Sequence, residues 1–284
     1  MTFDNLLISD SSKKLLKSYL KNSSLPLLIY GDKWTFKDQV AETIGSIVLN
    51  QTKLANHPFF LEIKASKSIA LDQIRALQNF QSLKTPAMNQ DIQRLIIIHH
   101  AEQMRIEAQN AILKNLEELS SDTLIILIAN SLNPILKTIR SRTVNIAIIP
   151  CSKEQLREAM IQKYPNNTNI DQILKISAGL PKLAAKMLHD NQYYQQELQI
   201  ARRIISSSRF EQLTLIDELI KNKNKVKDIL FIIRQMANQG LRTNNISTAR
   251  KWLKILDFTI LAEEDLGHNP QLKIFIMDYL LKFN

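Results

Sequence analysis

Short apolar runs alternate with helical segments through the first half of the chain, and this alternation constrains the fold more than any other feature. Uninterrupted apolar strands are buried on both faces, which is typical of parallel sheets covered by helices. The sequence therefore predicts an α/β fold with helices on both faces of a parallel sheet. The expected strands are 27–30, 59–63, 95–98, 123–128 and 143–149, and the expected helices between them are 37–49, 69–80 and 101–119.

The pattern changes after Pro150, where strand-like runs nearly vanish and helical segments follow one another. Pro181 occupies a favoured first-turn position of one of these helices. Longer helices follow from about residue 191 to the end of the chain. We therefore expect three domains: an α/β domain at 1–150, a small helical domain at 151–190 and an all-α domain at 191–284.

Composition limits the function classes without choosing one. The chain has 284 residues, of which 45% are hydrophobic and 23% are charged, and its net charge is +10. This balance is that of a folded globular protein, and the positive surplus favours polyanionic partners such as DNA, RNA or acidic protein surfaces. The single cysteine, Cys151, excludes an internal disulfide, and as a nucleophile it would need an activating partner.

No targeting or membrane-spanning segment is expected. The first residues lack a basic segment followed by an apolar stretch, which a secretory signal would need. No apolar run approaches the roughly 18–20 residues that cross a bilayer. We therefore expect a cytoplasmic protein without membrane contact.

The loop after the first strand has the length and context of a phosphate-binding P-loop, or Walker A motif. Gly31 and Lys37 match the first glycine and the lysine of the pattern G-x-x-x-x-G-K-[ST]. Phe36 replaces the second glycine, where the backbone must approach phosphate, and Trp34 adds bulk. Asp38 replaces the hydroxyl that would bind Mg²⁺. We expect a degenerate P-loop without a bound nucleotide, and hence no cofactor. A turn that never bound phosphate is the alternative.

The second half of a nucleotide-hydrolysing site, the Walker B position, is altered as well. Such a site needs acidic residues at the end of a central strand, but the strand 95–98 ends in His99 and His100. Imidazole is a poor ligand for Mg²⁺, and Glu102 lies two residues too far along the chain. Neighbouring strand residues point to opposite faces, so we expect no zinc site either. The two changes together indicate a fold kept without ATP hydrolysis.

A third group of residues carries a resemblance to a known family. Residues 110–118 read NAILKNLEE, an apolar strand follows, and residues 138–143 read TIRSRT. This order resembles the clamp-loader subunits of the AAA+ class, with their N-A-L-L-K-x-L-E-E helix, sensor strand and T-I-x-S-R-C sequence. The resemblance covers nearly the whole chain, and residues 57–143 most specifically. Shorter matches are His57-Pro58 with Phe60, Ile74-Arg75, Gly179 to Lys182 and Asn269 to Leu272.

The resemblance implies an AAA+ α/β domain, a helical lid and a helical collar through which such subunits assemble. With its altered P-loop, the chain is most similar to the non-hydrolysing scaffold subunit of the bacterial DNA polymerase III clamp loader. Such a subunit would join motor (gamma/tau) and delta subunits in a hetero-pentamer that loads a sliding clamp onto primed DNA. The chain itself would then not be an ATPase, although it would be part of the polymerase holoenzyme.

The resemblance also gives Arg142 a role. In AAA+ rings the ATP lies between subunits, and an arginine from the neighbour stabilises the charge that develops during phosphoryl transfer. Arg142, flanked by Ser141 and Thr143, matches this arginine finger. The family has cysteine where Thr143 stands, so the packing around the arginine differs. The alternative is that Arg142 makes a surface or intramolecular salt bridge.

Two other functions stay open. An active AAA+ ATPase or motor subunit would bind ATP by itself. A stand-alone basic nucleic-acid-binding protein would bind DNA with a steep dependence on salt. For the lysines between two helical segments we expect a solvated loop, with contact to DNA phosphates as the alternative; these are Lys221, Lys223, Lys225 and Lys227.

Overall fold

The computed structural model describes residues 2–21, 25–64, 69–81, 83, 92–206, 208, 211, 214–220, 222–242, 245–267 and 270–282. The chain divides into two compact units, Met1–Leu156 and Arg157–Asn284. The division into three domains with boundaries at 150 and 190 stays a prediction.

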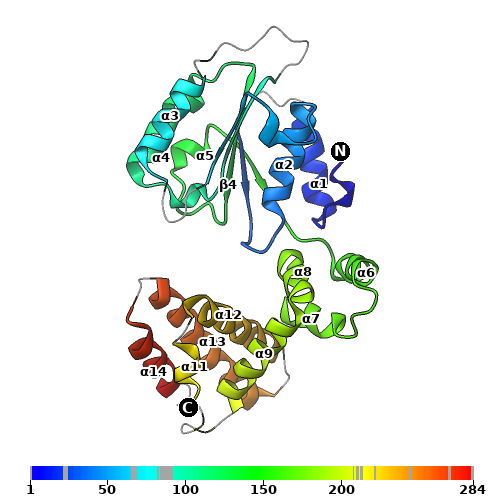
Figure 1. Cartoon of the computed structure of the whole chain (residues 1–284), viewed down its shortest axis with the longest axis vertical. Helices are drawn as coiled ribbons and strands as arrows, with labels where there is room; N and C mark the ends of the chain where they lie inside the picture. Colours follow the sequence, from blue (N-terminus) through cyan, green and yellow to red (C-terminus); the bar gives the residue numbers. More distant parts are fainter. Residues whose placement is uncertain are drawn as a thin grey trace. The chain divides into compact units, whose positions relative to one another are not determined.

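A parallel sheet of five strands forms the centre of the first unit (Figure 1). The strand order is β2-β3-β4-β1-β5, and every neighbouring pair is parallel. This confirms the predicted fold class, although the last strand is shorter than expected. The strands are β1 (Leu27–Tyr30), β2 (Phe60–Ile63), β3 (Arg94–Ile98), β4 (Thr123–Ala129) and β5 (Val144–Ala147).

Helices cover both faces of this sheet, as the apolar strands require (Figure 1). One face carries α1 (Asp10–Leu20) and α2 (Lys37–Val48), and the other carries α3 (Leu71–Gln81), α4 (Ile106–Glu117) and the short α5 (Lys137–Arg140). Short 3₁₀ turns cover Phe3–Asn5, Leu54–Asn56 and Ala101–Gln103.

Two of these helices differ from the sequence-based expectation. Helix α1 was not predicted from the sequence. It begins after Ser9, whose hydroxyl accepts a hydrogen bond from the backbone N–H of Ser12. The expected helix 101–119 is wrong at its start, because Met104 and Arg105 have extended backbone conformations. A 3₁₀ turn therefore ends before that point, and α4 begins after it.

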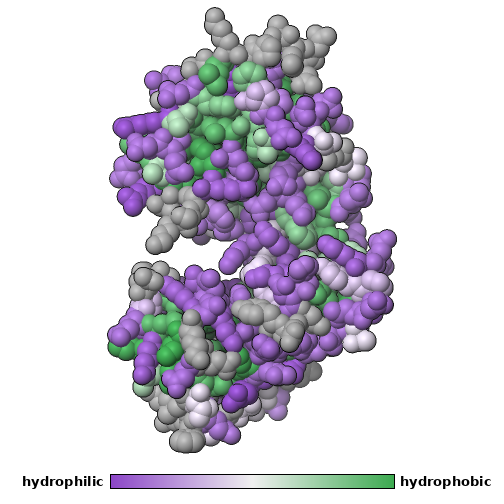
Figure 2. All heavy atoms as spheres, viewed as in Figure 1, coloured by the Kyte–Doolittle hydropathy of each residue, from purple (hydrophilic) through white to green (hydrophobic). Residues whose placement is uncertain are grey.

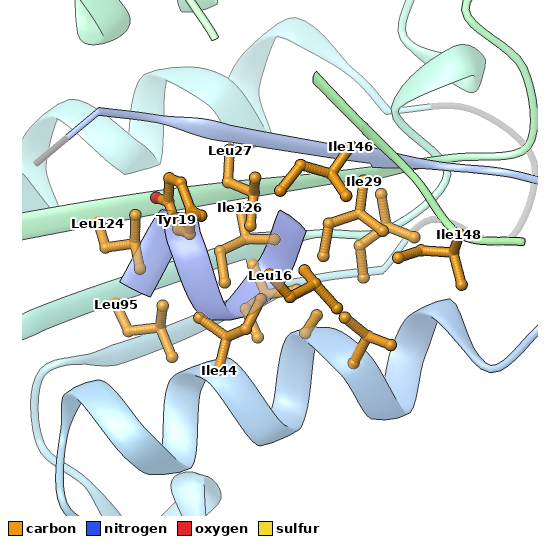
Figure 3. Packing of buried hydrophobic residues seen from close by; sticks show 14 of the residues in the cluster. Leu16, Tyr19, Leu27, Ile29, Ile44, Leu95, Leu124, Ile126, Ile146 and Ile148 are labelled. Carbon is orange, nitrogen blue, oxygen red and sulfur yellow. The ribbon is translucent and has the colours of Figure 1, made fainter. Parts of the chain in front are cut away.

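Successive strand residues supply two separate cores. Leu27 and Ile29 face α1 and α2, and they belong to the cluster that includes Leu16 and Ile44 (Figure 3). Leu28 belongs instead to the cluster on the face of α3 and α4. Because a strand alternates its side chains between faces, burying both faces requires the continuous apolar runs seen in the sequence.

The second unit is helical, and no strand occurs among its described residues. Pro181 opens α8, as predicted. Ser152 precedes the first helix: its hydroxyl accepts from the Gln155 N–H, and the Gln155 side chain accepts from the Ser152 N–H. The helices are α6 (Lys153–Lys163), which crosses the unit boundary, α7 (Ile170–Ile176), α8 (Pro181–His189), α9 (Asn191–Ser206), α11 (Ile216–Leu219), α12 (Lys223–Gly240), α13 (Ile246–Gly267) and α14 (Leu272–Lys282).

The basic run does not form the expected solvated loop. Lys223, Lys225 and Lys227 lie in the first turns of α12, and Lys221 lies outside the described residues. The ammonium of Lys225 lies 3.4 Å from Glu197 Oε1 of α9, a carboxylate whose side chain has no exposed surface. The expectation was wrong because the helix begins within the run, and Lys225 joins two helices.

The described helices include none that is both long enough and apolar enough to cross a membrane.

Candidate functional site

The loop between β1 and α2 is closed by its own hydrogen bonds. The Trp34 N–H donates to Asp32 Oδ1 at 2.8 Å, and the Thr35 N–H donates to the Asp32 carbonyl at 3.1 Å. In a P-loop, backbone N–H groups of this segment point at phosphates. Two of those donors are used within the loop here.

Gly31 has a packing role in this loop that does not involve phosphate. Its φ of +155° is unusual for residues with a side chain, and a Cβ atom there would lie 2.5 Å from the carbonyl oxygen of Ile148. The backbone of the segment after β5 therefore passes too close for any other residue. The glycine that matches the P-loop pattern is required by the fold itself.

Lys37, the first residue of α2, is almost completely buried, with 4% of its surface exposed. Its ammonium donates to the carbonyl oxygens of Gly31 at 2.9 Å and Asp32 at 2.5 Å, and to Asn130 Oδ1 at 3.1 Å. In a working P-loop, this amine reaches the β- and γ-phosphates. Here oxygen atoms of the chain itself accept its hydrogen bonds.

Asn130 directly follows β4 and is itself held in place. Its side-chain amide donates to Glu102 Oε1 at 2.6 Å, and its backbone N–H donates to Glu102 Oε2 at 3.1 Å. Glu102 lies in the 3₁₀ turn after β3. Asn130 was not predicted from the sequence, although β1 and β4 are neighbours and the carboxyl ends of parallel strands meet at one edge.

His99 bridges two carboxylates. Its Nδ1 lies 3.0 Å from Asp38 Oδ1 in the first turn of α2, and its Nε2 lies 2.8 Å from Glu62 Oε1 on β2. The His99 side chain is only 5% exposed. Burial acts to raise the pKa of Glu62, but hydrogen bonds from Lys64 and His99 outweigh it and hold that pKa below its usual value.

His100 has a different environment from His99. Its backbone is left-handed, with a φ of 52°, and its side chain is 47% exposed. Its Nδ1 lies 3.4 Å from Glu102 Oε1. In the described part of the chain, no three histidine, cysteine, aspartate or glutamate side chains form a group able to hold a metal ion. Cys151 is buried, and burial raises the pKa of its thiol.

Arg142 lies in the turn between α5 and β5, as the sequence predicts. Its Nη2 lies 2.6 Å from Glu117 Oε1 at the end of α4, and its Nη1 donates to the Thr138 carbonyl at 3.2 Å. The Arg142 side chain is 40% exposed. The intramolecular salt bridge considered from the sequence is therefore present in the free chain, on an arginine that solvent can reach.

Hydrogen bonds around Arg142 fix the backbone of its turn. The Thr143 hydroxyl donates to the Ile139 carbonyl at 3.1 Å, and the Ser141 hydroxyl donates to the Thr138 carbonyl at 3.0 Å. Both acceptors are carbonyls of α5, a helix too short to satisfy them within itself. A thiol donates more weakly than a hydroxyl, so Thr143 holds this turn at least as firmly as the cysteine of the family would.

Comparisons with known proteins show which proteins the chain is similar to. Residues 48–152 match the model of a family described as DNA polymerase III, delta subunit. The DNA polymerase III subunit delta′ of Pseudomonas aeruginosa is 33% identical over 154 residues, which cover 52% of this chain and 45% of that protein. The alignment thus spans less than half the length of this relative.

Longer but weaker similarity extends over most of the chain. The replication factor C small subunit of Sulfolobus acidocaldarius is 24% identical over 281 residues, 93% of this chain and 80% of that protein. A solved structure of a gamma subunit-related protein of DNA polymerase III from Thermotoga maritima has a TM-score of 0.57 at 20% identity, and the match covers 96% of this chain and 99% of that one. This last likeness concerns the fold alone. The family match over residues 48–152 and these relatives show that the chain is similar to clamp-loader subunits, and the parallel sheet with its helical second unit has the AAA+ fold.

Proposed function

We propose that this chain is the non-hydrolysing scaffold subunit, of the delta′ type, in a bacterial DNA polymerase III clamp loader. In this proposal it binds no ATP in its own degenerate site and gives Arg142 to the ATP of a neighbouring motor subunit. With motor and delta subunits it forms a hetero-pentamer that loads the sliding clamp onto primed DNA in the cytoplasm. Similarity to clamp-loader subunits supports assembly with other subunits of that kind.

The observation that carries the proposal is the set of oxygen atoms around Lys37. A bound triphosphate would have to replace the acceptors in Gly31, Asp32 and Asn130, all of which already bond the ammonium. It would also meet the carboxylate of Asp38, which His99 holds at the start of α2. Since like charges close together repel, this carboxylate disfavours a polyphosphate at the site.

The exposed position of Arg142 supports the second half of the proposal. An arginine finger that acts on a neighbour's ATP needs no nucleotide in its own subunit. The bonds of Arg142 go to Glu117 and Thr138, neither of which bonds the ammonium of Lys37. One chain can therefore have a P-loop that binds no nucleotide and still supply Arg142 to the ATP of a neighbouring subunit.

Apolar side chains on the last helices support assembly. Ile246, at the start of α13, is 74% exposed, and five further large hydrophobic residues on α13 and α14 are between 38% and 63% exposed. Figure 2 shows hydrophobic surface on this helical unit. Exposed apolar side chains that gather on neighbouring helices mark surfaces for protein contacts. The five further residues are Leu253, Ile260, Leu261, Ile274 and Met277.

Native mass spectrometry of this chain mixed with the motor and delta subunits tests the proposal. We expect a pentamer that contains one copy of the chain. The variant Ile274→Asp should enter the pentamer less readily, because it places a charge on the apolar surface. Ile106→Asp, the same change at an exposed position of α4, is the matched control. A chain that stays monomeric with both subunits present would contradict the proposal.

A further inference from the structure

The guanidinium of Arg142 is engaged at both of its terminal nitrogens within the free chain. Nη2 lies 2.6 Å from Glu117 Oε1, and Nη1 donates to the Thr138 carbonyl at 3.2 Å. The two acceptors come from α4 and α5 respectively. Because the guanidinium is a rigid planar fork, two acceptors on different helices set its direction.

This arrangement is weak enough to be exchanged. The side chains of Arg142 and Glu117 are 40% and 50% exposed. An exposed ion pair shifts an equilibrium by only about 1.4- to 5-fold. A phosphate group can bond a guanidinium through two oxygen atoms and carries more charge than a carboxylate, so it is the stronger partner.

The exchange is unfavourable for the carboxylate of Glu117. When Arg142 turns to a phosphate, the carboxylate of Glu117 loses its cation and lies close to a second anion. Both effects oppose engagement of the arginine. Glu118, the next residue, carries the same charge and is also exposed, but it is Glu117 that meets Arg142.

We propose that Glu117 is a positioning residue that holds Arg142 until a neighbouring ATP phosphate displaces it. This inference rests on the proposed function, because it needs Arg142 to act on the ATP of another subunit. In the free chain Glu117 fixes the direction of the guanidinium. It also opposes the move of the guanidinium to a phosphate, because the ion pair must break first. The exchange precedes the chemical step, so it changes the apparent affinity for ATP and leaves the rate at saturation unaltered.

The test is ATP turnover by the assembled complex as a function of ATP concentration. We expect Glu117→Gln to lower KM by about 1.4- to 5-fold with an unchanged kcat, since an exposed ion pair shifts an equilibrium by that factor. Glu118→Gln, the matched control, should leave both parameters unchanged. In the background of Arg142→Ala, the change at Glu117 should have no effect, because the group it acts through is gone. A merely structural role of Glu117 would persist in that background.

The results separate this inference from the proposed function. If Arg142→Ala lowers turnover but Glu117→Gln leaves KM unchanged or raises it, the role of Glu117 is refuted and the proposed function stands. If Arg142→Ala has no effect on turnover in a complex of full composition, both fail.

The free chain gives an independent check. Phenylglyoxal, a dicarbonyl reagent selective for arginine, should modify Arg142 faster in Glu117→Gln than in the unaltered chain, as followed by mass spectrometry of the peptides. Equal rates in the two would refute the pairing on which the inference depends.

Discussion

Two basic side chains at loops of the same sheet have opposite environments. Lys37 is 4% exposed and donates to oxygen atoms of three residues of its own chain, whereas Arg142 is 40% exposed and pairs with a solvent-facing carboxylate. A buried ammonium with several acceptors stabilises the subunit that contains it. An exposed guanidinium in a weak pair contributes little to the stability of its own subunit, and in the proposed function it is available to another.

The same contrast holds for the backbone around each group. The loop before Lys37 turns its N–H groups onto Asp32, inside the loop. The turn around Arg142 uses Ser141 and Thr143 to fix the backbone, while the arginine side chain stays at the surface. In the first region the ammonium of Lys37 is buried among acceptors of its own chain, and in the second region the fixed turn leaves one cation at the surface.

The largest expected effect separates the two groups by function. Arg142→Ala should lower ATP turnover about 10³-fold at the one site in the assembled complex that the arginine contacts. The free energy of unfolding of the free chain should fall by less than about 1 kcal/mol, as expected for an exposed ion pair. Arg140→Ala, at the end of α5 just before this turn, is the control. If Arg142→Ala leaves ATP turnover unchanged, Arg142 has no role in turnover and the contrast with Lys37 fails.

Lys37→Met should show the reverse pattern. Removing the ammonium takes a buried donor away from the carbonyl oxygens of Gly31 and Asp32 and from Asn130 Oδ1, which costs about 2–4 kcal/mol in the free energy of unfolding. Urea unfolding of the free chain measures this cost. Lys33→Met, which removes an exposed lysine beside Trp34, should change stability little. If both variants unfold at the same urea concentration as the unaltered chain, Lys37 has no structural role.

Glu62→Gln tests the bridge through His99. Its loss should cost about 1.5 kcal/mol at pH 7, the lower end for a hydrogen bond to a charged group. Because the pKa of Glu62 lies below the ordinary value of 4.5, its stabilising contribution is complete above that value and disappears as the pH falls through the folded-state pKa.

Unfolding of both proteins at several pH values measures this dependence. The difference between the unaltered chain and Glu62→Gln should be constant near neutral pH and should narrow below about pH 4.5. Glu42→Gln on the exposed side of α2 should show no such narrowing. If the difference in the free energy of unfolding grows as the pH falls, the pKa of Glu62 is not lowered by folding and the stabilising bridge is contradicted.

Thr143→Val is expected to have the smallest effect. Valine keeps the shape but removes the hydroxyl that donates to the Ile139 carbonyl, at a cost of about 1 kcal/mol in the free energy of unfolding. Thr143→Cys introduces the residue of the clamp-loader sequence pattern. Its free energy of unfolding should lie between those of the unaltered chain and Thr143→Val. In the assembled complex Thr143→Val should lower ATP turnover far less than Arg142→Ala does, since the guanidinium itself is kept. A loss as large as that of Arg142→Ala would mean that the turn, and not the charge, is what the partner uses.

Much of the fold could be predicted because burial leaves a direct pattern. The parallel sheet was predicted from uninterrupted apolar runs, since strands covered on both faces cannot alternate with polar residues. The helix α1 was missed because only Leu16 and Tyr19 among its large apolar residues are buried, while Leu15 is exposed. Neither glycine nor proline marks the break near Met104, so the sequence offered no signal for it.

In the candidate site, too, some residues could be predicted from the sequence and others could not. Phe36 and Asp38 were identified because a P-loop has a fixed local pattern, and a departure from it is visible in the sequence. Asn130 and Glu62 were missed because their partners come from distant segments that only the folded sheet brings together. The pairing of Glu117 with Arg142 had no sequence signal, since it joins the end of one helix to a separate turn.

The central claim is that the chain binds no ATP in its own site. Its most direct test is a calorimetric titration of the isolated chain with ATP in the presence of Mg²⁺. The account predicts no binding up to about 1 mM, the upper end of usual substrate affinities, because Lys37 is already bonded within the chain and Asp38 opposes the phosphates. Binding of ATP in the micromolar range would contradict it, and the chain would then be an ATP-binding subunit rather than a scaffold.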